Sequence, residues 1–374
     1  MSMKIGVPKE TAEGERRVAL VPDTVRSLTG TDGVEIVVQS GAGEAAGHPD
    51  DRYSEAGATV GSAAEVAAAD VVVRVGLPGT DQIGELRSGQ TLISHLSPWT
   101  SAETNAALAR AGVTALAMEA IPRTTRAQAM DALSSQATAA GYAATMIAVR
   151  ESGRFWGMLT TAAGTIRPAK VLVLGAGVAG LQAVATAKRL GAIVTGFDIR
   201  RAAWEQIASL GGRPLELDFI PDAEGEGGYA RPLTDEENEQ VREALAENAA
   251  KQDVIITTAA IPGRPAPLLI TAEAVANMEP GSVIVDLAAE TGGNCELTEA
   301  GQTVERDGVR IIGPLDLPSD LPGHASQLYS KNLENLLGLM ITDEGRFELN
   351  FDDDIIDAAC IAHQGEVRGE RTAR

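Results

Sequence analysis

One stretch, residues 170–201, constrains the fold more than any other part of this 374-residue chain. Its sequence is KVLVLGAGVAGLQAVATAKRLGAIVTGFDIRR. The apolar run Val171–Leu174 predicts a strand that is buried on both faces. A helical pattern follows it and ends in two basic residues and Gly191, the usual order at a helix C-terminus. The stretch therefore predicts a strand–turn–helix unit of a parallel α/β sheet.

The turn between this strand and this helix contains glycines in the pattern G-x-G-x-x-G. Gly175 permits the tight turn, Gly177 lets a pyrophosphate approach the backbone, and Gly180 lets the helix pack closely on the strand. The helix N-terminus then offers free N–H groups and the positive end of its dipole. Together these features predict that the turn binds a dinucleotide.

Asp198 stands where an acid binds the adenosine ribose of such a ligand. It lies 23 residues after Gly175 and directly follows a second predicted strand, 192–197. A carboxylate here would repel a 2′-phosphate, which favours NAD(H) over NADP(H). The adjacent Arg200 and Arg201 weaken that charge argument.

Composition excludes several kinds of partner. The formal net charge of −21 opposes direct binding to nucleic acid or to an anionic membrane surface, and fits either a salt-rich cytoplasm or an ordinary acidic soluble surface. Cys295 and Cys360 stand in no metal-ligand spacing, so neither a metal nor a disulfide framework is expected. The N-terminus has no signal-peptide pattern and no run reaches about 18 apolar residues, so we expect a cytoplasmic chain without direct membrane insertion.

The order of strands and helices predicts two doubly wound α/β domains joined by two long helices. Helical patterns over 126–151 and 324–340 are the candidates for these helices. The first domain is expected to comprise 1–136 plus 322–374, and the second 137–321, with the dinucleotide cleft between them. A polar loop is expected at 222–239. The strand candidates of the first domain are Lys4–Pro8, Val34–Gln39, Val71–Val75, Thr91–His95 and Val113–Met118.

Polar residues also gather in 9–22 and 121–142. In the second segment Gln128, Asp131 and Ser134 recur every three residues, so they could share a helix face turned toward the cleft. A helix N-cap followed by a solvated face fits the same spacing, and both interpretations stay open. His95 ends a strand candidate, where it is either a general acid/base or a hydrogen-bonded core residue.

Several segments resemble the alanine dehydrogenase/transhydrogenase family. The openings KIGVPKE (4–10) and RRVA (16–19) and the glycine-rich block are similar to the whole family. Four further segments resemble the NAD(H)-binding first domain of its proton-translocating transhydrogenase branch: PRTTRAQAMDALSSQ (122–136), EGGYA (226–230), TTAAIPGRPAP (257–267) and DLAAETGGNCE (286–296). The resemblance covers nearly the whole chain.

The resemblance implies a role for each matched residue. Those that hold and orient the nicotinamide correspond to Arg123, Gln128, Asp131 and Ser134. Those of the pyrophosphate turn correspond to Gly175, Gly177, Val178 and Gly180, and those around the adenosine ribose to Asp198, Ile199 and Arg200. A mobile loop that closes over the nucleotide corresponds to Gly228 and Tyr229, and a cofactor contact after the fourth strand to Ala260.

The implied function is that of the NAD(H)-binding alpha subunit, or its first part, of a proton-translocating transhydrogenase. Hydride would pass directly from NADH to NADP⁺ on a separate NADP(H)-binding beta subunit, and a membrane-spanning subunit would translocate protons. The chain would then be peripheral on the cytoplasmic membrane through its partners, and the family implies a homodimer. Hydride transfer between two nicotinamide rings requires positioning rather than an acid–base dyad.

Two alternatives remain. Arg17 and His95 match substrate groups of alanine dehydrogenase, but the positions that match its lysine and aspartate are Gly76 (or Arg74, if the register slips) and Glu290. These departures argue against amino-acid oxidation. A non-catalytic NAD(H) sensor would bind the nucleotide without turnover.

Overall fold

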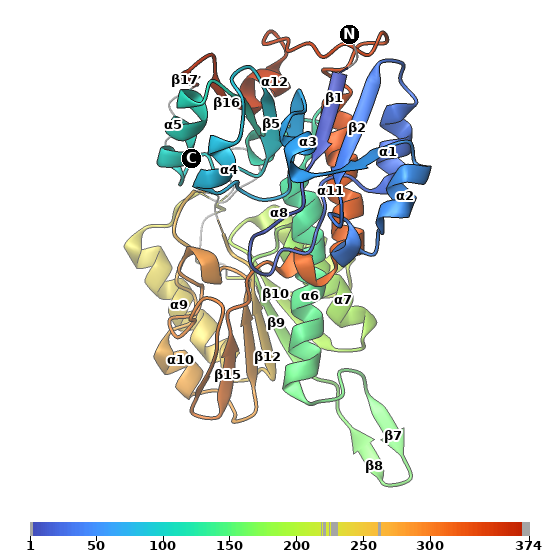
Figure 1. Ribbon diagram of the computed structural model, residues 1–374. Coiled ribbons are helices and arrows are strands. Elements are labelled where there is room, and N and C mark those ends of the chain that lie inside the picture. Colours follow the sequence, from blue (N-terminus) through green and yellow to red (C-terminus); the bar gives the residue numbers. More distant parts are fainter. Residues whose placement is uncertain are drawn as a thin grey trace. The chain divides into compact units, whose positions relative to one another are not determined.

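The computed structural model describes residues 3–217, 219, 222–223, 225, 231–260 and 263–368. The chain divides into two compact units, Met1–Gln136 with Pro318–Arg374, and Ala137–Leu317. Each unit has its own mainly parallel sheet with helices, so the fold is α/β with two Rossmann-like units, as predicted (Figure 1). The second boundary lies at 317/318, earlier in the chain than the predicted 321/322.

Both predicted long helices are present, but they relate differently to the division into units. α6 (Ala132–Ser152) contains the first boundary, which follows Gln136. α11 (Pro322–Leu337) begins after the second boundary and lies wholly in the first unit. Of the two, α6 alone is shared between the units.

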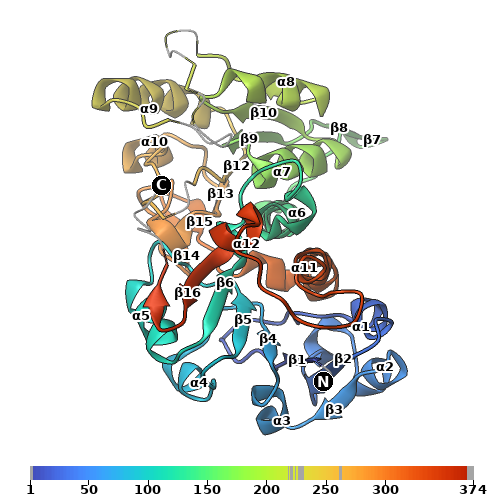
Figure 2. The same ribbon diagram turned by 90° about the horizontal axis from the view of Figure 1, so that it is seen from above.

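Among the described residues, the first unit is built on an eight-stranded sheet with the order β17-β16-β6-β5-β4-β1-β2-β3, which Figure 2 displays. The strands are β1 (Met3–Val7), β2 (Val34–Gln39), β3 (Thr59–Gly61), β4 (Val71–Val73), β5 (Thr91–Ser94), β6 (Thr114–Ala117), β16 (Cys360–His363) and β17 (Glu366–Val367). The helices besides α11 are α1 (Pro22–Thr29), α2 (Asp50–Glu55), α3 (Ala63–Ala67), α4 (Thr80–Gly84), α5 (Ala102–Arg110) and α12 (Asp354–Ala359). All five predicted strands are present, and β16 joins the sheet antiparallel to β6.

The order of this sheet reverses between β1 and β4. The chain adds β2 and β3 on one side of β1, and then returns to add β4, β5 and β6 on the other side. β1 pairs in parallel with both neighbours, so that Ile5 lies beside Ile36 and beside Val71. In an open parallel sheet, ligands bind at the carboxyl ends of the strands at such a reversal. The residues that follow β1 and β4 therefore occupy a favoured ligand position.

The second unit is built on a seven-stranded sheet with the order β11-β10-β9-β12-β13-β15-β14 within the described residues, parallel except for β14. The strands are β9 (Lys170–Leu174), β10 (Ile193–Phe197), β11 (Arg213–Pro214), β12 (Val254–Thr257), β13 (Val283–Asp286), β14 (Thr303–Arg306) and β15 (Val309–Ile312). The helices besides α6 are α7 (Val178–Arg189), α8 (Arg201–Ser209), α9 (Asp235–Ala249) and α10 (Ala272–Ala276). A separate hairpin is made of β7 (Leu159–Thr161) and β8 (Gly164–Ile166). This sheet reverses between β9 and β12, directly before the glycine turn.

The predicted polar loop 222–239 is too long, because α9 begins within it. Thr234 accepts a hydrogen bond from the backbone N–H of Glu237, and the Glu237 side chain accepts one from the backbone N–H of Thr234. This capping box satisfies two N–H groups that a helix start otherwise leaves unpaired. Its signature, T-x-x-E, was visible in the sequence. No helix among the described residues is long and apolar enough to cross a membrane.

Candidate dinucleotide-binding site

The glycine turn after β9 contains two glycines that the fold itself requires. Gly175 has a φ of +91°, which favours glycine, and a Cβ atom there would lie 2.9 Å from the backbone nitrogen of Ala259. A Cβ atom on Gly180 would lie 1.8 Å from the carbonyl oxygen of Gly175, which also accepts a hydrogen bond from the Thr258 hydroxyl at 3.0 Å. The turn, α7 and the residues after β12 are therefore packed backbone against backbone.

Gly177 differs from these two glycines. It is exposed, and no described atom lies within 4 Å of the position that its Cβ would occupy. It is also the N-cap of α7, where it has no side chain to bond the first N–H groups of the helix, and Val178 begins that helix. The open space and the helix N-terminus together suit an anionic ligand such as a pyrophosphate.

Asp198 follows β10 and has 7% of its surface exposed. Its carboxylate accepts the backbone N–H of Ala176 at 2.8 Å and that of Arg200 at 2.9 Å. It also accepts the Arg200 guanidinium through Nε at 2.9 Å and Nη2 at 2.8 Å. A carboxylate has about four acceptor positions, so these contacts use them. Asp198 therefore braces the glycine turn and is neutralised by Arg200, and the simple charge argument against a 2′-phosphate loses its force.

Two residues that the sequence analysis did not single out hold the neighbouring loop. Asp286 ends β13, is fully buried, and accepts five hydrogen bonds, from the hydroxyls of Thr257 and Thr298 and from the backbone N–H groups of Ala288, Asn294 and Cys295. The Asn294 side chain in turn accepts the N–H of Ala259 at 3.0 Å and donates to the carbonyl of Ala259 at 2.8 Å.

The loop held in this way leads to the predicted cofactor contact. Ala260 is exposed and directly follows Ala259, and Ile199 is half-buried beside Asp198. Gly228 and Tyr229 lie outside the described residues. An acid at the end of a strand, followed by G-G-N, was the available sequence signal for the Asp286–Asn294 network, but its hydrogen-bond partners could not be inferred from it.

In the first unit, three of the four predicted nicotinamide residues form a cluster at the start of α6. Asp131 precedes the helix and accepts the backbone N–H of Ser134 at 2.9 Å and its hydroxyl at 2.6 Å. Arg123 donates to the Ser134 hydroxyl at 3.3 Å and lies 3.8 Å from the Asp131 carboxylate. Gln128 is exposed in a separate 3₁₀ turn, Gln128–Met130.

The shared helix face predicted for Gln128, Asp131 and Ser134 is therefore wrong, and the helix-cap alternative describes Asp131 and Ser134 correctly. The helix begins at Ala132 rather than near 126. The physical reason is that Asp and Ser side chains bond nearby backbone N–H groups, which favours a helix start over a helix interior. The cluster nevertheless offers a guanidinium, a carboxylate and a hydroxyl within one turn.

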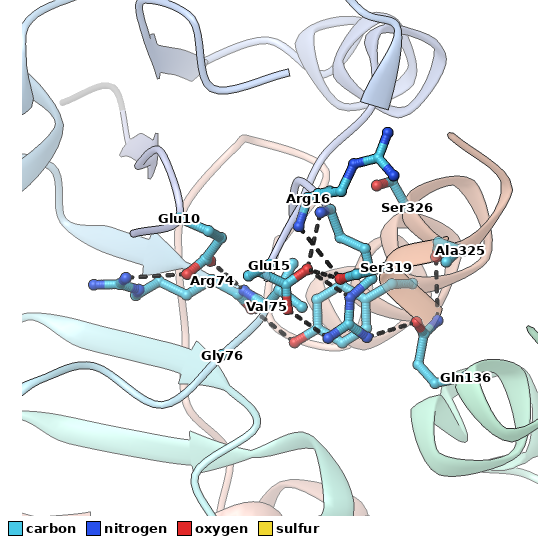
Figure 3. A network of polar contacts seen from close by, with 12 residues as sticks. Glu10, Glu15, Arg16, Arg74, Val75, Gly76, Gln136, Ser319, Ala325 and Ser326 are labelled. Carbon is cyan, nitrogen blue, oxygen red and sulfur yellow. Dashed lines mark hydrogen bonds and ion pairs between the residues drawn. The ribbon is translucent and has the colours of Figure 1, made fainter. Parts of the chain in front are cut away.

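The residues that kept alanine dehydrogenase as an alternative are occupied by internal partners (Figure 3). Arg17 is buried and pairs with Glu15 through Nε at 2.8 Å and Nη2 at 2.5 Å, and its Nη1 donates to Gln136 at 2.9 Å. The Ser319 hydroxyl also donates to Glu15 at 2.7 Å. Burial raises the pKa of Glu15, but the bonds from Arg17 and Ser319 outweigh it and hold that pKa below its usual value. Arg17 is thus already neutralised without any substrate carboxylate.

His95 also has a carboxylate neighbour. Its Nδ1 lies 3.5 Å from the Glu119 carboxylate, and its ring lies 5.2 Å from the ring of the buried Tyr329. Glu119 accepts the backbone N–H of Leu96 at 2.8 Å. The described contacts fit the interpretation of His95 as a packed, hydrogen-bonded residue.

Two doubly wound units, one with a glycine turn braced by the acid that follows β10, define a dinucleotide-binding α/β protein. Family models for the "Alanine dehydrogenase/PNT, N-terminal domain" and "C-terminal domain" match residues 6–140 and 144–370. The chain is 45% identical to the first part of NAD(P) transhydrogenase subunit alpha of Rhodospirillum rubrum, over 98% of this chain and 97% of that protein.

Solved structures show the same likeness. The transhydrogenase from Sinorhizobium meliloti has a TM-score of 0.89 at 44% identity, over 98% of this chain and 100% of that chain. An L-alanine dehydrogenase has a TM-score of 0.80 at 27% identity, over 98% of this chain and 97% of that one. This chain belongs to the alanine dehydrogenase/PNT family. It is accordingly an oxidoreductase with a nicotinamide cofactor.

Proposed function

We propose that this chain is the NAD(H)-binding alpha subunit, or its first part, of a proton-translocating transhydrogenase. The observation that carries the proposal is the match to the first part of such an alpha subunit over nearly the full length of both chains. NADP(H) would then be bound by a separate beta subunit, and protons would cross through a separate membrane-spanning subunit. Through these partners the chain would be peripheral on the cytoplasmic membrane.

The site residues receive distinct roles in this proposal. The N–H groups at the start of α7, together with Gly175, Gly177, Val178 and Gly180, bind the pyrophosphate. The segment Asp198, Ile199 and Arg200 lies along the adenosine ribose, and Ala260, Gly228 and Tyr229 complete the contacts to the nucleotide. The cluster of Arg123, Asp131 and Ser134, with Gln128, holds the carboxamide of the nicotinamide and fixes the plane of its ring.

The reaction asks these residues to position substrates rather than to move protons. NADH supplies a hydride, which carries two electrons, and NADP⁺ accepts it, so that NAD⁺ and NADPH form without exchange of a proton with water. Holding the two rings at reacting distance and excluding water supplies the acceleration. The lack of a free acid–base pair in the described cluster of Arg123, Asp131 and Ser134 is consistent with this chemistry.

The test mixes the purified chain with NADH and with a purified NADP(H)-binding component of a transhydrogenase. We expect NADPH to form only when both proteins are present, and we expect alanine with NAD⁺ to give no NADH with the chain alone. Alanine-dependent NADH formation by the chain alone would move the assignment to alanine dehydrogenase. NADH binding without either activity would identify a sensor instead.

Asp198→Asn is expected to shift cofactor preference toward NADP(H). The substitution removes the charge that neutralises Arg200, so the guanidinium becomes available to a 2′-phosphate. A hydrogen bond to a charged group contributes about 1.5–3 kcal/mol, so the ratio of NADPH to NADH affinity is expected to rise by at least about tenfold. Fluorescence titration with each reduced nucleotide measures this ratio. Asp222→Asn is the control, because Asp222 accepts the N–H of Arg201 and has no contact with the turn. An unchanged ratio in Asp198→Asn would remove Asp198 and Arg200 from cofactor selection.

The hairpin of β7 and β8 supports the proposal of a homodimer. Two three-residue strands are too few to be stable by themselves, and the hairpin and the segment before it expose Phe155, Met158 and Ile166 by 57%, 69% and 46%. A second copy of the chain would cover these apolar side chains.

Met158→Glu is therefore expected to weaken the dimer at least about a hundredfold, because it places a charge in the apolar contact. Light scattering over a dilution series measures the dissociation constant. The control is Leu210→Glu, which introduces the same charge at a residue 37% exposed at the end of α8. A wild-type chain that stays monomeric at high concentration would contradict the proposal.

A further inference from the structure

The first unit has a cavity of about 170 Å³ at the place where its sheet order reverses. Lys9 and Thr11, which follow β1, and Arg74 and Pro78, which follow β4, line it. This is the favoured ligand position of a doubly wound sheet, yet this unit has no glycine triplet after β1. Neither Arg17 nor His95 lines the cavity, so it is separate from the positions that match an amino-acid substrate site.

The cavity combines an apolar floor with a few polar groups, which is typical of a small-molecule site. The floor is formed by Val66 and Ala67 of α3, Val72 of β4, Leu86 and Leu92. These side chains come from elements on both sides of the reversal point. An apolar part of a ligand would therefore be covered.

Arg74 is the polar group that most needs a ligand. Its side chain is 7% exposed and its Nη2 donates to Glu10 at 3.0 Å (Figure 3). Its Nε–H, in contrast, is buried and has no hydrogen-bond partner among the described residues. A buried charged donor without an acceptor is unfavourable, and an acceptor atom of a ligand would satisfy it.

The charges around the cavity favour an anion. Lys9 and Arg74 line it against the single carboxylate of Glu85. The carboxylate of Glu10 is already engaged by Arg74 and by the N–H of Val75 at 2.6 Å. Lys9 forms no ion pair within the part of the chain that the structure describes. The surroundings are thus locally basic in a chain whose net charge is −21.

We infer that this cavity binds a short-chain organic monocarboxylate, with its carboxylate at Arg74 and Lys9 and its alkyl part on the apolar floor. The cavity is smaller than the roughly 300–1,000 Å³ of sites for drug-sized ligands, so a ligand of a few carbon atoms fits and a nucleotide does not. This inference does not rest on the proposed transhydrogenase function, because no residue of the glycine turn takes part.

The test titrates the full chain with sodium butyrate and follows binding by calorimetry and by saturation-transfer NMR of the butyrate methyl group. A ligand of this size is expected to bind with a dissociation constant of about 1–10 mM. Inorganic phosphate serves as the comparison, because it offers the charge without the apolar part. We expect butyrate to bind more tightly than phosphate; equal or tighter phosphate binding would overturn the monocarboxylate assignment.

Two alanines of α3 provide a matched pair of variants. Ala63 lines the cavity, whereas Ala64, the next residue of the same helix, does not, and both are exposed. Ala63→Phe is expected to weaken butyrate binding at least about tenfold, and Ala64→Phe to leave it unchanged. Arg74 itself is left intact, because its removal would strand the buried carboxylate of Glu10.

The readouts separate this inference from the proposed function. The wild-type melting temperature in both variants would establish that they fold, and NADH affinity is expected to be the same in all three proteins. Saturable butyrate binding that survives Ala63→Phe, or no saturable binding by the wild-type chain, would overturn the inference whatever the outcome of the hydride-transfer experiment.

Discussion

Gly180→Ala is expected to destabilise the second unit by about 2–4 kcal/mol or more and to abolish NAD(H) binding. The new methyl group would lie 1.8 Å from the carbonyl oxygen of Gly175 and 2.9 Å from the Thr258 hydroxyl. The first of these atoms belongs to the backbone of the turn, so α7 could accommodate the methyl group only by moving away from β9. Urea unfolding and NADH fluorescence titration measure the two effects.

Gly177→Ala is the matched control within the same turn. No described atom lies within 4 Å of its Cβ position, so the free energy of unfolding is expected to change by no more than about 0.5 kcal/mol. NAD(H) affinity should nevertheless fall at least about tenfold, because the methyl group would occupy the space through which a pyrophosphate approaches the backbone. Full NAD(H) affinity in Gly177→Ala would exclude this turn as the phosphate site, and wild-type stability in Gly180→Ala would show that the packing of α7 is adaptable.

Asp286→Asn is expected to lower the free energy of unfolding by about 2–4 kcal/mol, although it changes only one atom. All five described partners of the Asp286 carboxylate donate to it, and the residue is fully buried. An asparagine would direct its own N–H donors at some of these groups and leave them unpaired. Because Asn294 depends on this carboxylate and holds Ala259, NADH affinity should also fall.

The control is Asp253→Asn, which changes a partly exposed carboxylate in the same unit. Asp253 pairs with Arg154 at 2.7 Å and accepts the N–H of Lys170 at 2.8 Å, with 22% of its side chain exposed. Pairs near the surface contribute little, so a loss of about 1 kcal/mol or less is expected. If Asp286→Asn costs no more than Asp253→Asn, the Asp286 network does not stabilise the loop before Ala260.

The features that could be predicted from the sequence are those whose causes lie within a few residues. The run Val171–Leu174 is a buried strand, and Gly175 has the positive φ that a tight turn needs. The capping box of Thr234 and Glu237 was equally local, so the start of α9 was available in the sequence and was missed. Asp131 and Ser134 show the limit of spacing: the same interval fits a helix face and a helix cap, and only the backbone geometry separates the two.

By itself, the sequence determined the two α/β units, the glycine turn and the acid after β10, because strand burial, turn geometry and helix capping depend on neighbouring residues. Only the tertiary structure decided which of the charged groups are already satisfied. Glu15 meets Ser319 across 304 positions of the chain, and Arg17 meets Gln136 across 119. Whether a side chain can bind a ligand depends on whether distant groups already use its donors and acceptors, and no local pattern records those contacts.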